Sequence, residues 1–476
     1  MSLTDLPKVP PDDPRLTPRQ IGKSGLCIGC GACVARSGGS NATMRLDRYG
    51  QFKPSIPGRS TDKGLPNFAE LCPFSPHARN EDEIARERFP SARYRDPMIG
   101  HFETAYVGHV REASFRADGS SGGMASWTAV ELLARNMVDG VAHVVPRSDG
   151  EDDRQPLFRY RISRTVEDVR SGAKSRYYPV EMSAIIDEIR RRPGRYAVVG
   201  IPCFVKAVHL LRRQEPVLRE RIAFTLGLFC GHMKSARFVE SFAWQLEAGM
   251  GEVAGVDYRL KDAGRPANWY TAQLRLKDGS SRSKDWWHLV DGDWGAGYFQ
   301  NSACNFCDDV VAETADISFG DAWVEPYSSD GRGTNVVVVR SPLLQRLVVD
   351  AADEGRLDLS EIDGDFVVRT QAAGFRQRRE GLAFRLSWLR SGIGPNKRVA
   401  PKRSGLPARR MLVYWLRSSI SAWSHRVFWL ARALHMPRLY TSWASTMLAL
   451  YQGLTYSRGW VGKLIDRIAG RTDTGD

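Results

Sequence analysis

The chain has 476 residues, 42% of them hydrophobic and 26% charged, which is the composition of an ordinary globular protein. This length is sufficient for two or three structural units with large cores. The first residues contain no apolar signal segment, and no uncharged apolar run reaches the roughly 18 residues of a membrane span. We therefore expect a cytoplasmic protein whose cysteines are reduced.

The net charge of +14 is concentrated at the C-terminal end. Residues 376–476 contain 19 Lys and Arg but only 4 Asp and Glu, which leaves 49 basic and 50 acidic residues in the rest of the chain. Together with the patterns below, this predicts four regions. They are a disordered leader over 1–20, a small cysteine-containing unit over 21–100, an α/β domain over 101–375 and a basic helical tail over 376–476.

Three closely spaced cysteines, Cys27, Cys30 and Cys33, begin the small unit, and Cys72 follows about forty residues later in a Cys-Pro pair. Zinc sites normally divide their ligands two and two. Three cysteines at successive spacings of three, with a distant Cys-Pro, are instead typical of iron-sulfur proteins. The second motif of a small bacterial ferredoxin is missing. We expect one four-cysteine site here, which we call the outer cysteine group.

Strand-like and helix-like patterns alternate from residue 105 onward, which predicts an α/β domain with a mostly parallel sheet. The tryptophan-rich residues 252–300 are expected to form an irregular or antiparallel insertion. Strands are predicted over 105–110, 141–145, 158–162, 196–200, 222–230, 315–319 and 335–339, and helices over about 121–135, 204–213, 238–246 and 342–354.

Two turns of this domain could bind an anionic cofactor. Ser121, Gly122 and Gly123 lie between a strand and a helix, where glycines allow close backbone approach and the helix start favours phosphate. The spacing matches no standard nucleotide motif, so a capping role for Ser121 explains it equally well. Lys174 and Ser175 lie in a small-residue turn that could hold a phosphate or an anionic flavin ring, or could be an exposed basic loop.

The four remaining cysteines lie in the middle of the chain. Cys203 and Cys230 each follow an apolar run, and Cys304 and Cys307 form a C-x-x-C pair. The two thiolates of such a pair can face the same ion or cluster, and strand ends meet at one edge of a sheet. We expect a second four-cysteine site, called the inner cysteine group, which assigns all eight cysteines of the chain.

The order of these motifs resembles that of the coenzyme F420 hydrogenase/dehydrogenase β-subunit family over about residues 22–350. The resemblance implies an iron-sulfur flavoprotein in which FAD lies near a cluster and exchanges electrons between one-electron carriers and a two-electron substrate or deazaflavin. Larger members, including the chlorophyll-cycle reductases, similarly have an additional N-terminal cluster region. The motifs that carry the resemblance are Ser121-Gly122-Gly123, Gly172-Ala173-Lys174-Ser175, Ile201-Pro202-Cys203, Phe229-Cys230, and Cys304-x-x-Cys307-Asp308 followed by Ala312-Glu313-x-Ala315-Asp316-Ile317-Ser318.

Applied to this chain, the resemblance implies one 4Fe-4S cluster on the inner cysteine group and a second on the outer group. It also implies a ferredoxin-like donor or a deazaflavin, with coenzyme F420 as a candidate co-substrate, and a small-molecule or glycan-related substrate. It identifies no catalytic residue and no oligomeric state. The residues implied to lie against FAD are Ser121, Gly122, Gly123, Lys174, Ser175, Gly331 and Thr334.

Several alternatives stay open at this point. We prefer cell-surface polysaccharide biosynthesis to a chlorophyllide-type ring reductase, because the outer motif and basic tail differ from those of the pigment reductases. A non-catalytic protein with two structural zinc sites, each of four cysteines, is a second class. In a third, Cys203 at a helix start is a nucleophile with a lowered pKa, and His209 or His232 is its base. This third hypothesis leaves the other inner cysteines unexplained.

The basic tail contains an apolar stripe at steps of three and four residues, which predicts an amphipathic helix. Arginines around the stripe and tryptophans at its edge suit an anionic membrane surface. The alternative is that the stripe packs on the α/β domain or on a second subunit. Nucleic acid is not an expected partner, because the aromatic residues lie in the apolar stripe. The stripe consists of Leu412, Leu416, Ile420, Trp423, Val427, Leu430 and Leu434, and it continues after Pro437 with Leu439, Trp443, Met447 and Leu450.

Overall fold

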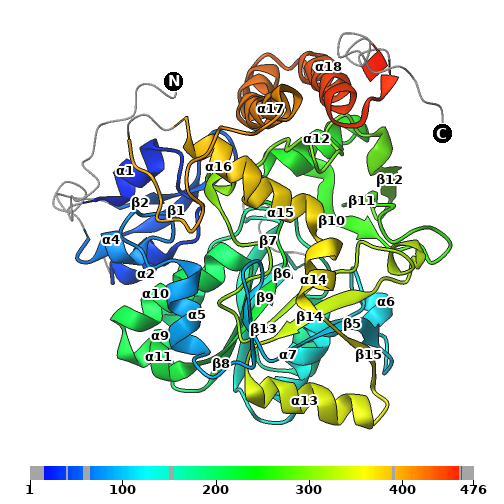
Figure 1. The fold of residues 1–476 in the computed structure, drawn as a ribbon. Coiled ribbons are helices and arrows are strands. Elements are labelled where there is room, and N and C mark those ends of the chain that lie inside the picture. The colour runs from blue at the N-terminus through cyan, green and yellow to red at the C-terminus, as the bar shows by residue number, and fades with distance from the viewer. Residues whose placement is uncertain are drawn as a thin grey trace.

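A computed structural model describes residues 16–38, 41–56, 65–148, 155–388, 392–459 and 462–463. Its centre is an eight-stranded sheet with the order β15-β5-β14-β13-β9-β8-β6-β7 (Figure 1). Five of these strands, β5, β13, β9, β8 and β6, run in one direction, as expected of a mostly parallel sheet, and the parallel pairs are the central ones, β13-β9, β9-β8 and β8-β6. The strands are β5 (Thr104–Val110), β6 (Gly140–Pro146), β7 (Phe158–Ser163), β8 (Tyr196–Gly200), β9 (Ile222–Leu228), β13 (Ile317–Asp321), β14 (Asn335–Val339) and β15 (Leu357–Ile362).

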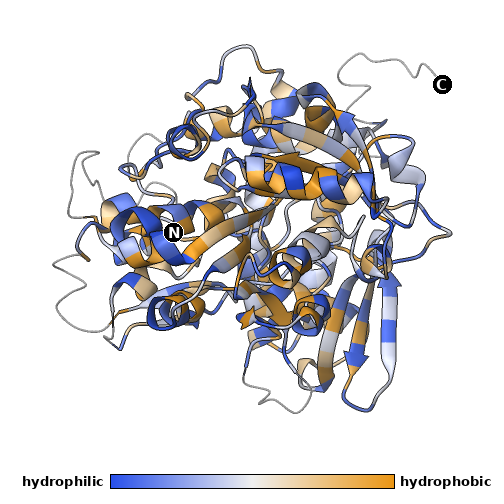
Figure 2. Cartoon of the chain, turned by 90° about the horizontal axis from the view of Figure 1, so that it is seen from below, coloured by the Kyte–Doolittle hydropathy of each residue, from blue (hydrophilic) through white to orange (hydrophobic). Residues whose placement is uncertain are grey.

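Helices cover both faces of this sheet because its strands are apolar on both sides. On β6 and β8, Ala142 and Val198 pack in one core cluster with α10 (Pro202–Gln214). The alternating neighbours Val141 and Ala197 pack in another cluster, with α7 (Met124–Ala134) and α13 (Pro342–Asp353). This is the two-residue period of a strand that is buried on both faces. Figure 2 shows helices whose colour alternates between hydrophobic and hydrophilic along their length, as amphipathic helices require.

The N-terminal unit starts earlier than expected. Helix α1 (Pro18–Lys23) begins after Thr17, whose side chain forms a capping box with Gln20. Residues 16–20 therefore belong to this unit and not to a disordered leader, while residues 1–15 lie outside the described residues. The other elements are α2 (Ala32–Arg36), β1 (Thr43–Leu46), β2 (Phe52–Ser55), α4 (Phe68–Leu71), α5 (Glu81–Arg88), β3 (Tyr94–Asp96) and β4 (Gly100–Phe102).

The tryptophan-rich insertion contains a three-stranded antiparallel sheet, β10 (Val253–Leu260), β11 (Thr271–Leu276) and β12 (Ser281–Asp285), which was one of the two expectations. The long helices α17 (Ala408–Ala433) and α18 (Pro437–Tyr456) pack beside each other on the core cluster of this insertion. Residues 408–456 of the C-terminal region therefore have a large buried contact with the rest of the protein. No helix among the described residues is long and apolar enough to cross a membrane.

The face that α17 buries differs from the predicted stripe. Leu416 and Ile420 are buried as expected, whereas Leu412, Trp423 and Leu430 are exposed. The reason is that polar side chains on the buried face form hydrogen bonds with the rest of the protein. A search for apolar residues at helical spacing does not detect such positions. The Ser424 hydroxyl accepts a hydrogen bond from the Phe299 amide at 2.9 Å, and the Arg417 side chain donates to the Gly295 carbonyl at 2.7 Å.

The remaining helices are α6 (Phe115–Asp118), α8 (Val166–Ser171), α9 (Ser183–Arg191), α11 (Pro216–Arg221), α12 (Arg237–Gln245), α14 (Gly364–Thr370), α15 (Ala372–Arg378) and α16 (Glu380–Leu386), with short 3-10 helices η1 (Met250–Glu252), η2 (Trp286–His288), η3 (Ser302–Phe306) and η4 (Tyr327–Ser329).

Candidate functional site

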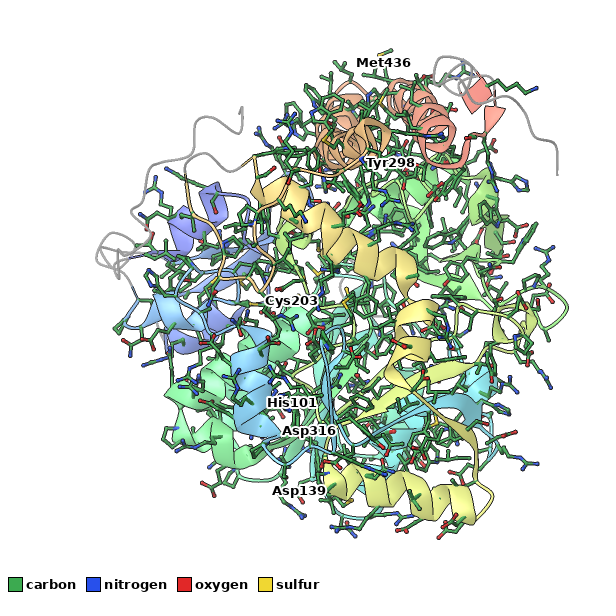
Figure 3. The ribbon with its side chains drawn as sticks, viewed as in Figure 1. His101, Asp139, Cys203, Tyr298, Asp316 and Met436 are labelled. Atoms are coloured by element: carbon green, nitrogen blue, oxygen red, sulfur yellow. The ribbon has the colours of Figure 1, made fainter. Side chains whose placement is uncertain are left out.

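The predicted site residues gather at one edge of the sheet. Cys203 follows β8 at the start of α10, and Cys230 lies two residues beyond β9. The turn at Gly122 follows β5, which runs in the same direction, and Thr334 precedes the antiparallel β14. Carboxyl ends of parallel strands share one edge, where ligands bind in α/β sheets. Figure 3 shows Cys203 near the middle of the molecule.

Three cysteines of the inner group are buried and Cys230 is partly exposed, and the four thiols lie close enough to influence one another. Burial raises the pKa of Cys203 well above its ordinary value, and the charges of Cys307, Cys230 and Cys304 raise it further. The Met233 amide donates a hydrogen bond to the Cys304 sulfur at 3.3 Å. Thiols in such a site are poor hosts for four negative charges alone. They fit an iron-sulfur core, whose positive charge would replace the thiol protons; with its four thiolates the whole cluster would be anionic, and its sulfurs would accept amide hydrogen bonds.

Arg378 provides a positive charge beside the inner group. Its Nη2 donates hydrogen bonds to the carbonyls of Cys230 at 2.9 Å and Gly231 at 2.6 Å. Burial alone would lower the pKa of Arg378, but the negative charges of Cys307 and the other inner cysteines raise it. Its Nη1 is buried without a hydrogen-bond partner among the described residues, which fits an anionic group at this position.

A buried ion network fixes the loop that follows the C-x-x-C pair. The Lys397 ammonium lies 2.9 Å from the Asp308 carboxylate, and the Arg398 guanidinium lies 2.6 Å from Glu313. Burial alone would raise the pKa of Asp308, but the charges of Lys397 and Arg398 outweigh it and hold that pKa well below its usual range. Neither basic residue was expected at the site, because both lie in the region predicted as a basic helical tail.

The outer cysteine group depends on local backbone geometry. Gly29 and Gly31 both have φ of +84°, which L side chains rarely adopt. A Cβ on Gly31 would also lie 2.5 Å from the Glu181 carboxylate. Burial raises the pKa of Cys30 to about 12. A pocket is lined by all four cysteines of the group, Cys27, Cys30, Cys33 and Cys72, and this arrangement fits a cluster bound between them.

The two groups share one hydrophobic core and are joined by hydrogen bonds. The Ser302 hydroxyl, two residues before Cys304, donates to the Gly25 carbonyl at 2.5 Å, and the Asn301 side-chain amide donates to the Ile28 carbonyl at 3.4 Å. Cys30 also contributes to the raised pKa of Cys203. The outer group thus lies next to the inner group and not in a detached module.

No set of three or more His, Cys, Asp or Glu side chains meets the spacing for a single metal ion within the residues that the structure describes. A tetrahedral zinc ion with Zn–S bonds of about 2.3 Å would separate its sulfurs by about 3.8 Å. A cluster carries its own sulfides between the irons, so its protein thiolates are further apart.

The residues implied for FAD meet around the turn after β5. The Ser121 hydroxyl donates to the Thr334 carbonyl at 2.9 Å, and the Ser175 amide donates to the Ser120 hydroxyl at 2.8 Å. Gly122 and Gly123 lie between these contacts, at the start of α7. Lys174 forms an ion pair with Asp257 at 3.1 Å. Three separate turns therefore form one surface.

The insertion supplies a further lysine that the sequence did not identify. Lys261, just beyond the end of β10, donates hydrogen bonds to the carbonyls of Ser121 at 2.9 Å and Arg332 at 2.8 Å. Burial lowers its pKa to about 8. Gly331 packs against the same insertion, since a Cβ there would lie 2.1 Å from the Arg265 carbonyl. Packing against the insertion therefore requires a residue without a side chain at position 331. The sequence pattern did not predict this contact.

The nucleophile hypothesis for Cys203 was wrong about the pKa, which is raised and not lowered. Burial and the neighbouring thiols outweigh the effect of the helix start. The His209 ring is hydrogen-bonded to the Thr314 carbonyl at 2.8 Å, and the His232 ring stacks on Trp294 with centroids 4.0 Å apart. Neither ring has a hydrogen bond to Cys203 in the described part of the chain.

The family models match the part of the chain that contains these motifs. Residues 105–187 match the model of the N-terminal part of the coenzyme F420 hydrogenase/dehydrogenase β subunit, and residues 194–365 match that of its C-terminal part. The chain is 24% identical over 225 residues to a coenzyme F420-dependent sulfite reductase of Methanocaldococcus jannaschii. That match covers 44% of this chain and 31% of the relative. A chain in a structure of the F420-reducing NiFe hydrogenase complex from Methanosarcina barkeri is 18% identical, with a TM-score of 0.48, over 63% of this chain and 99% of that chain.

Proposed function

Because the chain belongs to the coenzyme F420 hydrogenase/dehydrogenase β-subunit family, we propose that it is an iron-sulfur flavoprotein oxidoreductase. The observation that carries the proposal is the inner cysteine group, in which four cysteines from three chain segments, three of them buried and Cys230 partly exposed, lie beside the partly unpartnered guanidinium of Arg378. Such a donor set is suited to an anionic cluster of iron and sulfide.

In this proposal the inner group holds one 4Fe-4S cluster and the outer group a second. When bound, the clusters carry electrons singly, and FAD can accept them singly and deliver them in pairs. The chain's own residues exclude water and hold the thiols in place. Arg378 offsets negative charge at the inner group, and the pair of Lys397 with Asp308 at 2.9 Å keeps the C-x-x-C loop in position.

The proposed flavin site consists of the three turns that meet after β5. The amide groups at the start of α7 and the nearby Lys174 and Lys261 provide positive potential for a phosphate or an anionic flavin ring. Binding a phosphate at Lys174 would require this lysine to exchange its partner Asp257 for the ligand. The residues proposed to contact FAD are Ser121, Gly122, Gly123, Lys174, Ser175, Gly331 and Thr334.

The proposed electron source is a ferredoxin-like protein or a reduced deazaflavin such as coenzyme F420, and the proposed acceptor is a small molecule or a glycan precursor. We keep cell-surface polysaccharide biosynthesis as the proposed context, since the outer motif and basic tail differ from those of pigment reductases. Neighbouring genes test this choice directly: glycosyltransferase genes would support it, and pigment genes would favour a chlorophyllide-type ring reductase.

Anaerobic purification tests the cofactors. We expect brown protein that contains about eight irons, matching sulfide and one released FAD per chain, as two 4Fe-4S clusters and one flavin require. Two zinc ions in a colourless protein would overturn the proposal in favour of structural zinc sites. Turnover that survives Cys304→Ala but not Cys203→Ala would instead favour a cysteine nucleophile.

The flavin surface has its own test. Lys174→Ala should weaken FAD retention during gel filtration, while Lys402→Ala, an exposed lysine of the C-terminal region, should not. Equal FAD content in both variants, with full iron in each, would remove Lys174 from the flavin site.

A further inference from the structure

One face of α17 is exposed and strongly apolar, although the opposite face is buried on the insertion core. Fifteen large hydrophobic residues are exposed in the described part of the chain, and seven of them lie between 412 and 436. Such a concentration on a folded surface marks an interaction site. The seven are Leu412 (44% exposed), Trp415 (54%), Trp423 (51%), Trp429 (40%), Leu430 (43%), Leu434 (53%) and Met436 (53%).

The spacing of these residues places most of them on one side of the helix. Leu412, Trp415, Trp423, Leu430 and Leu434 fall on the same side of a helix with about 3.6 residues per turn. Met436 follows in the connection to α18, and Figure 3 shows it at the outer edge of the molecule, with Tyr298 beneath the two helices. The exposed face therefore points away from the sheet and from the cysteine groups.

The charge around this face is positive, and neither α17 nor α18 contains an acidic residue. The sequence has no Asp or Glu from residue 381 to residue 465. The Arg426 guanidinium lies over the Trp423 ring at 5.0 Å, and that of Arg48 lies over the Trp429 ring at 5.4 Å. Arg438, at the start of α18, is exposed. The tryptophans are thus bordered by guanidinium groups.

Two other arginines of α17 are neutralised by acidic residues of the protein body. Arg410 forms an ion pair with Glu380 at 2.9 Å, and Arg432 forms one with Glu240 at 3.6 Å. These pairs connect the helix to the rest of the protein. We therefore place the positive charge that a partner would meet at the exposed Arg48, beside Trp429, and at Arg438.

We propose that the exposed face of α17 docks the protein on the surface of an anionic lipid bilayer. Tryptophan and leucine side chains would enter the headgroup region, and the arginines would meet lipid phosphates. The helix would lie along the surface, since it is not long and apolar enough to span a membrane. A second copy of the same face is a poorer partner, because it would oppose arginine with arginine, and the acids beside α17, Glu380 and Glu240, already pair with its own arginines. This inference does not depend on the proposed redox activity.

The test uses the full chain with cofactors and vesicles of phosphatidylcholine alone or mixed equally with phosphatidylglycerol. We expect binding to the mixed vesicles to be at least about tenfold tighter and to weaken as salt rises. The double variant Trp415→Ser and Trp423→Ser should lose about tenfold or more in affinity. Trp287→Ser is the matched control, because Trp287 is 55% exposed on the short helix η2, and it should bind as the unchanged chain does.

Thermal unfolding midpoints equal to that of the unchanged chain verify that each variant is folded. Should the double variant be unfolded, tryptophan fluorescence of the unchanged chain decides the question: brominated lipids in the mixed vesicles should quench it. The proposal would be overturned by any of three results. These are a lack of quenching, equal binding to neutral and anionic vesicles, and unchanged vesicle binding by the double variant. A shift from dimer to monomer in the double variant, without vesicle binding by the unchanged chain, would assign the face to contact between copies.

Discussion

The outer and inner cysteine groups differ in the charges that surround them. The inner group has the buried Arg378, whose side chain is hydrogen-bonded to the Cys230 carbonyl. Cys30 of the outer group instead has the Glu181 carboxylate nearby, which raises the pKa of this thiol in addition to the larger effect of burial. Lys206 is also close to the outer group but forms an ion pair with Glu81 at 3.2 Å.

This difference has a direct consequence for electron flow if both groups hold clusters. A nearby positive charge stabilises the reduced, more negative cluster, and a nearby carboxylate destabilises it. The outer group would therefore have the lower reduction potential and the inner group the higher one. Electrons would move downhill from the outer group toward the flavin surface at the edge of the sheet.

The largest effect is expected from Cys307→Ala, because this cysteine belongs to the group at the sheet edge. Loss of one ligand should remove the inner cluster, disturb flavin binding, and reduce turnover by about 100-fold or more. Iron, FAD and activity are measured together. Normal turnover with a full flavin content would contradict the proposal that electrons pass from the outer group through the inner group to the flavin.

Cys30→Ala should have a smaller and separable effect. It should remove about half of the iron while FAD stays bound, because the flavin turns are built from other segments. Reduction by a ferredoxin-like protein should fail, whereas a small chemical reductant should still reduce the flavin. Because the outer group shares its core with Cys203, the folded state must be checked by thermal unfolding. Complete loss of FAD would show that the two groups act as one unit.

Arg378→Gln tests the charge on the inner side. We expect the inner cluster's reduction potential to fall by on the order of 50–100 mV, the effect of losing one charge at close range in a protein interior. Potentiometric titration followed by EPR measures this shift. Arg385→Gln is the control: Arg385 is also buried and donates to the Asn305 carbonyl at 2.8 Å, but its pKa is lowered by burial and by the charges of Arg417 and Arg378, whereas that of Arg378 is raised by the cysteines. Equal shifts in both variants would remove the specific role of Arg378.

The smallest effect is expected from Glu181→Gln, which should raise the outer cluster's potential by on the order of 20 mV. Burial raises the pKa of Glu181. The carboxyl is neutral below that raised pKa and charged above it. The unchanged protein and the variant should therefore have the same potential in acid and diverge as pH rises. A constant difference at every pH would exclude titration of this carboxyl as the cause.

Much of the fold could be predicted from periodicity, because strand and helix patterns are local. The strands predicted over 196–200 and 335–339 have the observed bounds, and the helix predicted over 342–354 ends one residue earlier. The exposed side of α17 could not be predicted in the same way. Its burial depends on contacts with the insertion, such as the hydrogen bond between Phe299 and Ser424.

The sequence by itself determined the two sets of cysteines, since C-x-x-C spacing and the order of motifs are short-range properties that need no fold. Only the tertiary structure decided which charges meet those cysteines. Arg378 lies 148 positions from Cys230 in sequence, and Arg398 lies 85 from Glu313. The partners of a buried ion pair are brought together by the fold and can be far apart in sequence. The spacing of charged residues along the chain therefore does not predict which of them will pair.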